Sequence, residues 1–338
     1  MTESLFLRAC RGERTERAPI WIMRQAGRYL PEYRKLREGR TMLEAIKDPE
    51  IVVEATMQPI RRFGFDAAIL FSDLTLPFTA MGAPFEIGEG VGPVIGHPIR
   101  NAADLEALHL FEPEEDLPYV FSAIRELRRQ LTTPLIGFTG APFTWACYLI
   151  EGGPSRDLKR TKAMLYGEPE LWRRLMELLS RVIARYLAAQ IEAGAQAVQI
   201  FDSWVGHLSP ETYRSVIQPH MKGILETLRP LGAPIILFGT GNPMLLEAMA
   251  ECRPDVLGVD WRVSLSTVAK LTPGLPLQGN LDPAILLTDP ATIKARALEV
   301  LEEGRQAPSH IFNLGHGIYP ETPLENVERL MTTVVGSS

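Results

Sequence analysis

Short runs of apolar residues recur along the chain, and a longer amphipathic stretch follows each of them. Runs that are apolar almost throughout are typical of strands buried on both faces of a parallel sheet. The stretches at residues 50–63, 170–193 and 211–228 are long enough for helices. We predict strands at residues 19–22, 67–71, 135–138, 197–201, 235–238, 256–259, 277–278 and 310–313.

A capping side chain followed by proline marks most of the predicted helix starts. Proline suits the first helical position because its missing N–H has no partner there, and the preceding polar side chain accepts from free backbone N–H groups. These starts are Asp48-Pro49, Glu168-Pro169, Ser209-Pro210, Asn242-Pro243, Asp289-Pro290 and Glu321-Thr322-Pro323. Eight strands alternating with helices predict an α/β fold, a single (β/α)8 TIM barrel, and an open doubly wound sheet is the alternative.

The whole chain, residues 1–338, is predicted to be one domain, with an N-terminal arm at 1–17 and a frayed tail at 335–338. A glycine-rich stretch at residues 88–96 predicts a short insertion, a hairpin or a loop, after the second strand. Its glycines do not form a dinucleotide-binding fingerprint, because Pro93 intervenes and no helix start follows.

Composition narrows the class of protein. No segment approaches about 18 uninterrupted apolar residues, so we expect no membrane partner. Three isolated cysteines and the absence of an apolar leader favour the reducing cytoplasm. The net charge of −6 argues against a nucleic-acid partner. Residues 1–40 nevertheless carry a balance of +5 and the remainder −11. A solvated basic arm is the ordinary interpretation of that charge.

In a barrel of this kind, catalytic groups follow the C-terminal ends of the strands. Polar and aromatic side chains at those positions are therefore expected to converge on one mouth. They are Arg24, Arg28, Ser72, Asp73, Thr139, Pro142, Phe143, Tyr148, Asp202, Ser203, Trp204, His207, residues 239–242, Asp260, Asn280, Asp282 and residues 315–317.

Several mechanisms lack the residues they need. All seven lysines fall in predicted helices or their approaches, which disfavours Schiff-base chemistry. No histidine lies within two residues of a cysteine, and no nucleophile elbow occurs, so zinc and serine chemistry have little support. Arginines remain, and a guanidinium binds carboxylates bidentately and keeps its charge, which indicates an anionic substrate. The alternative is that Arg24 and Arg28 pair on the surface with Glu32 or Glu44.

The string at residues 20–34, Ile-Trp-Ile-Met-Arg-Gln-Ala-Gly-Arg-Tyr-Leu-Pro-Glu-Tyr-Arg, closely resembles the signature of the uroporphyrinogen decarboxylase family. Further motifs of that family follow in the expected order, at residues 71–73, 140–144, 148–153, 201–206 and 313–318. The resemblance implies a TIM barrel that works as a homodimer without a metal or prosthetic cofactor. It implies conversion of uroporphyrinogen III to coproporphyrinogen III in haem biosynthesis, with four acetate carboxyls lost as CO2.

The resemblance also implies roles for individual residues. The stretch Arg24, Gln25, Ala26, Gly27 and Arg28 matches a substrate-binding segment, in which Arg24 and Arg28 hold side-chain carboxylates. Asp73 matches the carboxylate placed at the centre of the macrocycle, and Arg37 matches an arginine that takes part in proton delivery. The remaining matches, to substrate-contacting positions, are Tyr148, Ser203 and His316.

Ordinary roles stay open for three of these residues. Ser203 caps a turn in that interpretation, Tyr148 packs with only its hydroxyl exposed, and His316 binds backbone. Asp202 and Trp204 are not carried over, because the residues around the serine vary in the family. The rival functions are a methyltransferase of the same superfamily and a non-catalytic tetrapyrrole binder.

Overall fold

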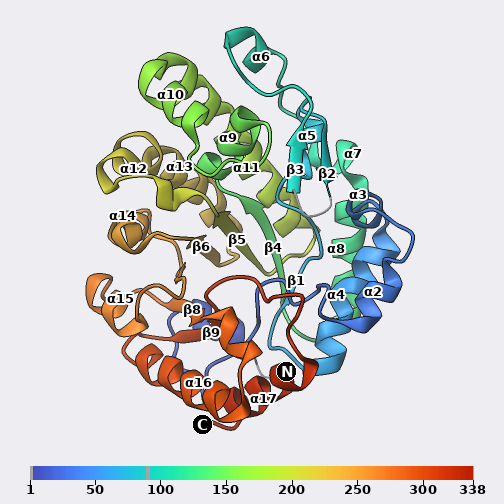
Figure 1. Cartoon of the computed structure of the whole chain (residues 1–338), viewed down its shortest axis with the longest axis vertical. Helices are drawn as coiled ribbons and strands as arrows, with labels where there is room; N and C mark the ends of the chain where they lie inside the picture. Colours follow the sequence, from blue (N-terminus) through green and yellow to red (C-terminus); the bar gives the residue numbers. More distant parts are fainter. Residues whose placement is uncertain (1–2, 89–91, 338) are drawn as a thin grey trace.

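Seven parallel strands form one curled sheet at the centre of the molecule, and helices surround it (Figure 1). The computed structural model describes residues 3–88 and 92–337. Each strand pairs with the next in the chain, in the order β1-β4-β5-β6-β7-β8-β9. Their bounds are β1 Ala68–Ile69, β4 Leu135–Gly140, β5 Ala197–Asp202, β6 Ile235–Gly239, β7 Val256–Gly258, β8 Leu277–Leu281 and β9 His310–Leu314. This sequential order is TIM-barrel-like and excludes the doubly wound alternative, in which the strand order reverses.

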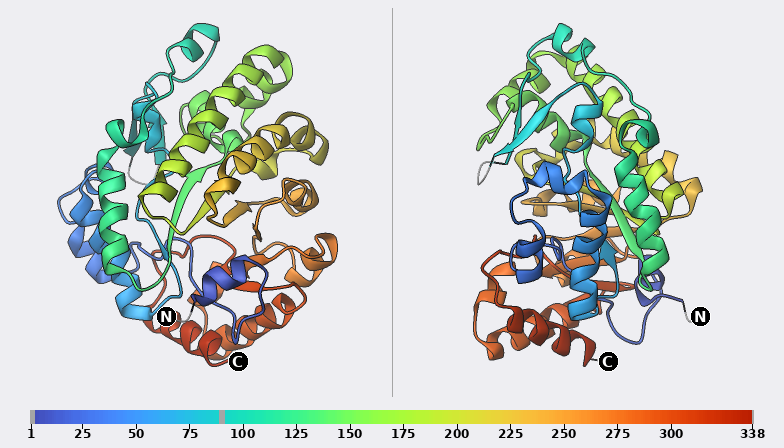
Figure 2. Two further views of the ribbon diagram at one scale, coloured as in Figure 1. Left: turned by 180° about the vertical axis from the view of Figure 1, so that it is seen from behind. Right: turned by 90° about the vertical axis from the view of Figure 1, so that its right-hand side faces the viewer.

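Helices connect successive strands and cover the outside of the sheet (Figures 1 and 2). Their bounds are α1 Leu5–Cys10, α2 Pro31–Leu36, α3 Met42–Ile46, α4 Pro49–Phe63, α5 Pro77–Ala80, α6 Ala102–Glu106, α7 Pro113–Asp116, α8 Pro118–Gln130, α9 Pro142–Glu151, α10 Lys159–Gly167, α11 Pro169–Ala193, α12 Pro210–Val216, α13 Gln218–Leu228, α14 Leu246–Ala250, α15 Leu265–Leu271, α16 Pro290–Gly304 and α17 Leu324–Val335. Short 3₁₀ turns are η1 Val205–His207, η2 Arg229–Leu231, η3 Pro243–Leu245 and η4 Pro283–Leu287. No helix of the described chain has the length and apolar character needed to cross a bilayer.

The predicted first strand, residues 19–22, is present as a single parallel bridge between Ile20 and Phe312 of β9. The Phe312 N–H donates to the Pro19 carbonyl at 2.8 Å, and Trp21 N–H donates to the Phe312 carbonyl at 3.3 Å. On its other side, the Ile20 carbonyl accepts from the Asp66 N–H at 2.8 Å. The segment therefore lies between β9 and the residues that precede β1.

A hydrogen-bonded chain crosses the interior of the sheet. The Trp21 indole donates to Gln278 Oε1 at 3.0 Å, and Gln278 Nε2 donates to Gln199 Oε1 at 2.9 Å. All three side chains are buried, and buried polar groups are stable when they are paired in this way. The chain joins residues 19–22 to β8 and β5, so the site segment that follows Trp21 starts from a fixed position.

The helix predictions at 50–63 and 170–193 are confirmed by α4 and α11, whereas the single helix at 211–228 is wrong. That stretch is divided into α12 and α13 at Ile217. Pro219 explains the break, because proline lacks the N–H that a continuous helix requires and restricts the residue before it. Of the six predicted caps, Asp48, Ser209 and Asp289 accept backbone N–H groups.

The other three predicted helix starts differ from the prediction. The Glu168 side chain makes no capping hydrogen bond at the start of α11. Pro243 opens the 3₁₀ turn η3, and α14 begins only at Leu246. Pro323 precedes α17 and occupies its cap position.

The chain ends and the glycine-rich stretch add detail. Helix α1 lies in the predicted arm, buries Phe6 and Cys10, and packs at the start of β9, where Ser309 Oγ donates to the Ala9 carbonyl at 2.6 Å (Figure 2). The ordinary interpretation of a solvated basic arm is therefore wrong for α1. Strands β2 Phe85–Gly88 and β3 Gly92–Ile95 pair antiparallel, and residues 89–91 between them lie outside the described residues.

Candidate active site

The predicted site residues follow strand ends at one edge of the sheet. Asp73 comes after β1, Tyr148 lies in α9 after β4, and Ser203 comes after β5. His316 follows β9, and Arg24 follows the bridged segment 19–22. Because all the strands are parallel, these residues share the C-terminal edge, where barrel enzymes place their chemistry.

Arg24 adopts a backbone conformation that non-glycine residues rarely take. Its φ is +63°, in the left-handed region, which costs a residue with a Cβ about 1–2 kcal/mol. The neighbouring residues hold it there, because Met23 N–H donates to Asn313 Oδ1 and Ile318 N–H donates to the Met23 carbonyl, both at 3.0 Å. The Arg24 side chain lies against the Cα of Gly317, where a Cβ would overlap it. The motifs at 20–28 and 313–318 therefore form one unit.

Gln25 has a structural role in this segment. The side chain is fully buried, and its Nε2 donates to the Ala67 carbonyl at 3.3 Å. Its carbonyl accepts from the Tyr29 hydroxyl at 2.8 Å. The turn is tight, since a Cβ on Gly27 would lie 2.9 Å from the Arg24 carbonyl oxygen. Gln25 thus fixes the loop, and half-buried Ala26 and Gly27 present their backbone.

The carboxylates proposed as surface partners of the two arginines are engaged elsewhere. Glu32 accepts from Arg62 Nε at 2.7 Å, and Glu44 forms a capping box with Thr41 at the start of α3. Arg24 and Arg28 are both exposed, and neither forms an ion pair with any residue in 3–88 or 92–337. The surface-pairing alternative with Glu32 or Glu44 is therefore wrong.

Arg37 ends α2 and lies on the ring of Tyr33. Its Cζ is 5.9 Å from the ring centroid, and Nη1 is 3.3 Å from the Tyr33 hydroxyl. Nη2 donates to the Arg40 carbonyl at 3.1 Å, while the buried Nε has no partner in the described part of the chain. Tyr33 in turn packs edge-on against Phe71, with centroids 5.4 Å apart, two residues before Asp73. Tyr33 thus connects Arg37 to the segment that carries Asp73.

Asp73 is half-buried and is held through one carboxylate oxygen. Oδ1 accepts from the Thr75 N–H at 2.8 Å and from the Thr75 hydroxyl at 2.5 Å. Among the residues that the structure describes, Oδ2 accepts no hydrogen bond, and it is not a buried orphan. One oxygen therefore sets the orientation of the carboxylate, and the other is left to accept from a ligand.

The charges of Asp73 and Arg24 both reach Tyr148. Burial raises the pKa of the Tyr148 hydroxyl, the Trp204 indole counteracts the rise, the Asp73 charge adds to it and Arg24 opposes it. The Tyr148 and Trp204 rings meet edge-on with centroids 6.1 Å apart. Burial lowers the pKa of His316, and the charges of Arg24 and Arg262 lower it further. Tyr148 and His316 are therefore uncharged polar groups within reach of the same arginine.

Ser203 and Asp202 lie on opposite sides of the sheet wall. Ser203 is half-buried, and its carbonyl accepts from the Thr240 hydroxyl at 2.6 Å. Asp202 is fully buried, accepts from the Thr144 hydroxyl at 2.7 Å through Oδ1 and leaves Oδ2 without a partner in the described chain. Burial raises the pKa of Asp202 to about 7. The Thr144 hydroxyl also accepts from Trp204 N–H at 3.3 Å, so this pair supports the turn that carries Ser203.

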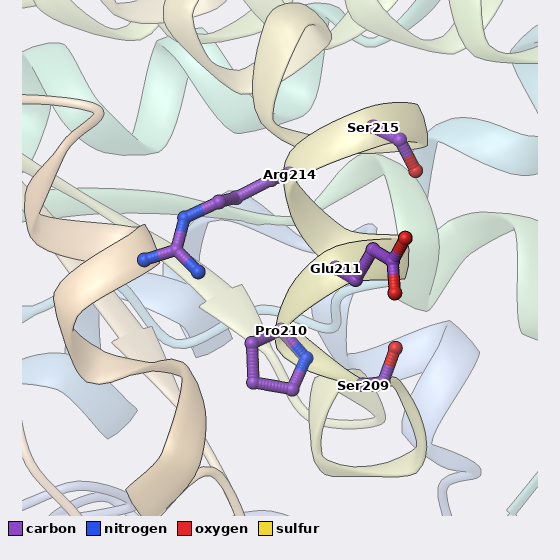
Figure 3. A pocket seen from close by; sticks show the side chains of 5 residues that line it. All are labelled: Ser209, Pro210, Glu211, Arg214 and Ser215. Carbon is purple, nitrogen blue, oxygen red and sulfur yellow. The ribbon is translucent and has the colours of Figure 1, made fainter.

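A surface hollow elsewhere on the molecule carries none of these residues. It measures about 680 Å³ and is lined by Ser209, Pro210, Glu211, Arg214 and Ser215 of α12 and its cap. Figure 3 shows Arg214 directed away from Glu211, Ser209 and Ser215. Arg214 pairs with Glu251 at 2.7 Å, so its charge is already neutralised. We do not assign the active site to this hollow.

Ligand sets for a metal were also considered. In residues 3–88 and 92–337, no group of three or more His, Cys, Asp or Glu side chains is arranged to hold an ion.

The curled parallel sheet with uncompensated arginines at its C-terminal edge defines a TIM-barrel-like protein with an anion-binding mouth. The model of the family described as uroporphyrinogen decarboxylase (URO-D) matches residues 1–336. Proteins named uroporphyrinogen decarboxylase match over nearly their full length. The one from Thermus thermophilus is 51% identical over 334 residues, covering 99% of this chain and 98% of that protein. The one from Sorangium cellulosum is 52% identical over 332 residues, covering 97% and 95%. The chain belongs to the uroporphyrinogen decarboxylase family.

Among solved structures, a methyltransferase from Methanosarcina mazei superposes with a TM-score of 0.81 at 24% identity, covering 98% of this chain and 97% of that one. At that identity the likeness shows the shared fold alone. It agrees with the TIM-barrel-like arrangement of the sheet and carries no argument about methyl transfer.

Proposed function

We propose that the chain converts uroporphyrinogen III to coproporphyrinogen III by removing four acetate carboxyls as CO2. The observation that carries the proposal is the half-buried Asp73 carboxylate, with Oδ1 fixed by Thr75 and Oδ2 free, in the same field as Tyr148 and Arg24. The family membership supports the same reaction, since its relatives are named for it. A single carboxylate is a suitable acceptor for four pyrrole N–H groups that point toward one centre.

The arginines at the mouth serve an octacarboxylate. Arg24 and Arg28 are exposed and carry no ion pair among the described residues, so their guanidinium forks are available for substrate carboxylates. The chain as a whole is at −6, and a locally positive mouth attracts an anion despite that charge. His316 and Tyr148 add polar contacts, as does Ser203, and Gln25, Ala26 and Gly27 form the loop that presents the arginines.

The chemistry then follows from charge stabilisation. Protonation of a pyrrole α-carbon creates a cation on the ring, and Asp73 stabilises that cation electrostatically. The electrons of the bond between the acetate methylene and its carboxyl move into the ring as CO2 leaves. A proton adds to the methylene to make a methyl group, and loss of the α-proton restores the pyrrole. The protonated ring is thus the electron sink, and the proposal needs no cofactor.

Arg37 is proposed to take part in proton delivery. A guanidinium is a very poor acid, so it would act by holding a water molecule or a carboxylate in position. Its buried Nε, which lacks a partner among the described residues, and its stacking on Tyr33 suit a fixed donor of hydrogen bonds.

Finer points of architecture complete the proposal. We propose that residues 19–22 take the place of the missing strand and close the barrel as (β/α)8, that residues 1–338 form one domain, and that 85–95 is an insertion. We also propose a cytoplasmic homodimer. The free thiols of Cys10, Cys147 and Cys252 are all buried, which suits a reducing compartment.

The test is release of CO2 from uroporphyrinogen III under anaerobic conditions. The proposal predicts multiple turnovers, four CO2 per substrate and coproporphyrinogen III as product. Tight binding without CO2 release would indicate a tetrapyrrole binder.

A further inference from the structure

Arg262 lies in the turn after β7, on a buried carboxylate that does not belong to the predicted site. Asp260 is fully buried, and its Oδ2 accepts from Arg262 Nη1 at 2.6 Å and from Gly241 N–H at 2.5 Å. Its Oδ1 accepts from the Arg262 N–H at 2.9 Å. Asn280 Nδ2 donates to the carbonyls of Asp260 and Val263 at 2.9 and 2.6 Å, so both ends of the turn are fixed.

The guanidinium of Arg262 is held in place on a second side by an aromatic ring. Its Cζ is 3.9 Å from the centroid of Trp261, which is a close cation–π stack. The side chain is nevertheless 44% exposed. Most exposed arginines are mobile and lose that freedom when they bind, whereas this one is ordered before any ligand arrives.

The turn faces the candidate active site. The Trp261 ring meets His316 edge-on, with centroids 6.0 Å apart and an interplanar angle of 88°. Gly315 lies directly against the Trp261 backbone, where a Cβ would overlap it. The charges of both Arg24 and Arg262 lower the pKa of His316 after burial does. Arg24 and Arg262 thus act on the same imidazole from two different loops.

The Arg262 fork keeps free donors. A guanidinium has five N–H groups, and Asp260 takes one of them on Nη1. In the chain as described, no other acceptor contacts the side chain. The free N–H groups are enough for a bidentate contact with a second carboxylate.

We propose that Arg262 binds one of the four carboxylates that the substrate retains through the reaction. This inference rests on the proposed function. Four acetates are lost one after another, so a binding group that works in every round needs a carboxylate that is present in every round. Only the four retained carboxylates meet that condition. Arg262 is exposed and distant in sequence from Asp73, which suits a contact with the periphery of the macrocycle.

The test compares Arg262→Gln and Arg262→Lys with the parent and with Arg305→Gln. Arg305 follows α16, pairs with Glu302 at 2.7 Å and is 64% exposed. It precedes β9 and so lies toward the opposite edge of the sheet, which makes Arg305→Gln a matched control. The readouts are KM and kcat for uroporphyrinogen and the Kd of coproporphyrinogen, measured by anaerobic fluorescence titration, with thermal unfolding of each variant.

Arg262→Gln is expected to raise both KM and the Kd of coproporphyrinogen about tenfold or more, because a charge-assisted contact is lost. Its kcat stays within about twofold of the parent value, since the reacting centre is untouched. Arg262→Lys, which keeps the charge and loses the fork, gives an intermediate Kd, and Arg305→Gln matches the parent.

Unchanged KM and Kd in both Arg262 variants overturn the inference and leave the proposed function intact. A rise in KM without a rise in the coproporphyrinogen Kd overturns the assignment to a retained carboxylate. A parent that binds coproporphyrinogen but releases no CO2 overturns the proposed reaction, while the Kd comparison still decides the role of Arg262. A parent that binds no coproporphyrinogen overturns both.

Discussion

The Asp73 carboxylate is locked by Thr75, two residues further along the chain, which donates both its N–H and its hydroxyl to Oδ1. The remaining oxygen is accessible and accepts nothing among the described residues. An anion meant to meet several N–H donors must point in one direction, and this pair of hydrogen bonds sets that direction.

Thr75→Val should lower kcat about tenfold or more, because it removes the hydroxyl and leaves the carboxylate free to turn. Thr75→Ser keeps the hydroxyl and should restore kcat. The measurement is steady-state kinetics with uroporphyrinogen for the three proteins. Equal kcat in the Val and Ser variants would mean that the orientation of Asp73 does not matter.

Arg24 allows binding and backbone strain to be separated. Arg24→Ala and Arg24→Gly should both raise KM and make it less sensitive to salt, because a positive charge at the mouth is lost. Only the glycine relieves the left-handed backbone at φ +63°, so its free energy of unfolding should exceed that of the alanine variant by about 1 kcal/mol. Urea unfolding and KM at two ionic strengths check this. An unchanged KM would assign Arg24 a structural role.

Asp202 predicts a pH dependence of stability. Its pKa is raised from 3.8 to about 7 by burial, so between these values the unfolded chain has released the proton and the folded chain retains it. Stability from this group is therefore complete below about pH 4, falls as the pH rises toward 7 and is level above it. Asp202→Asn should raise the Tm at pH 8 relative to the parent more than at pH 4.5. The same Tm difference at both values would show that Asp202 does not titrate in this range.

Much of the fold follows from local patterns. Apolar runs separated by amphipathic stretches predict a parallel sheet, and the caps at Asp48, Ser209 and Asp289 behave as the short-range rules require. The break at Ile217 was missed because the amphipathic pattern continues through it, although Pro219 carried the signal. The edge at residues 19–22 depends on pairing with β9, nearly three hundred residues away, which no local pattern reports.

The candidate site was predicted in part. The rule that chemistry follows strand ends correctly brought Tyr148, His316 and Arg24 to one edge, and parallel strands explain why. The rule cannot say which way a side chain points, so it did not separate Asp202, which is buried behind the wall, from Ser203. Arg262 was missed because the list stopped at Asp260, and its ordering depends on Trp261 and on a contact with His316 from another loop.

The most direct test of the central claim is CO2 release by Asp73→Asn. The amide is nearly isosteric and can still accept from Thr75, but it has no negative charge to stabilise a protonated pyrrole. With uroporphyrinogen III under anaerobic conditions, the parent should release four CO2 per substrate, and Asp73→Asn should keep the parent fold while losing at least about 99% of kcat. A folded Asp73→Asn protein that releases CO2 at near the parent rate would contradict the central role of Asp73.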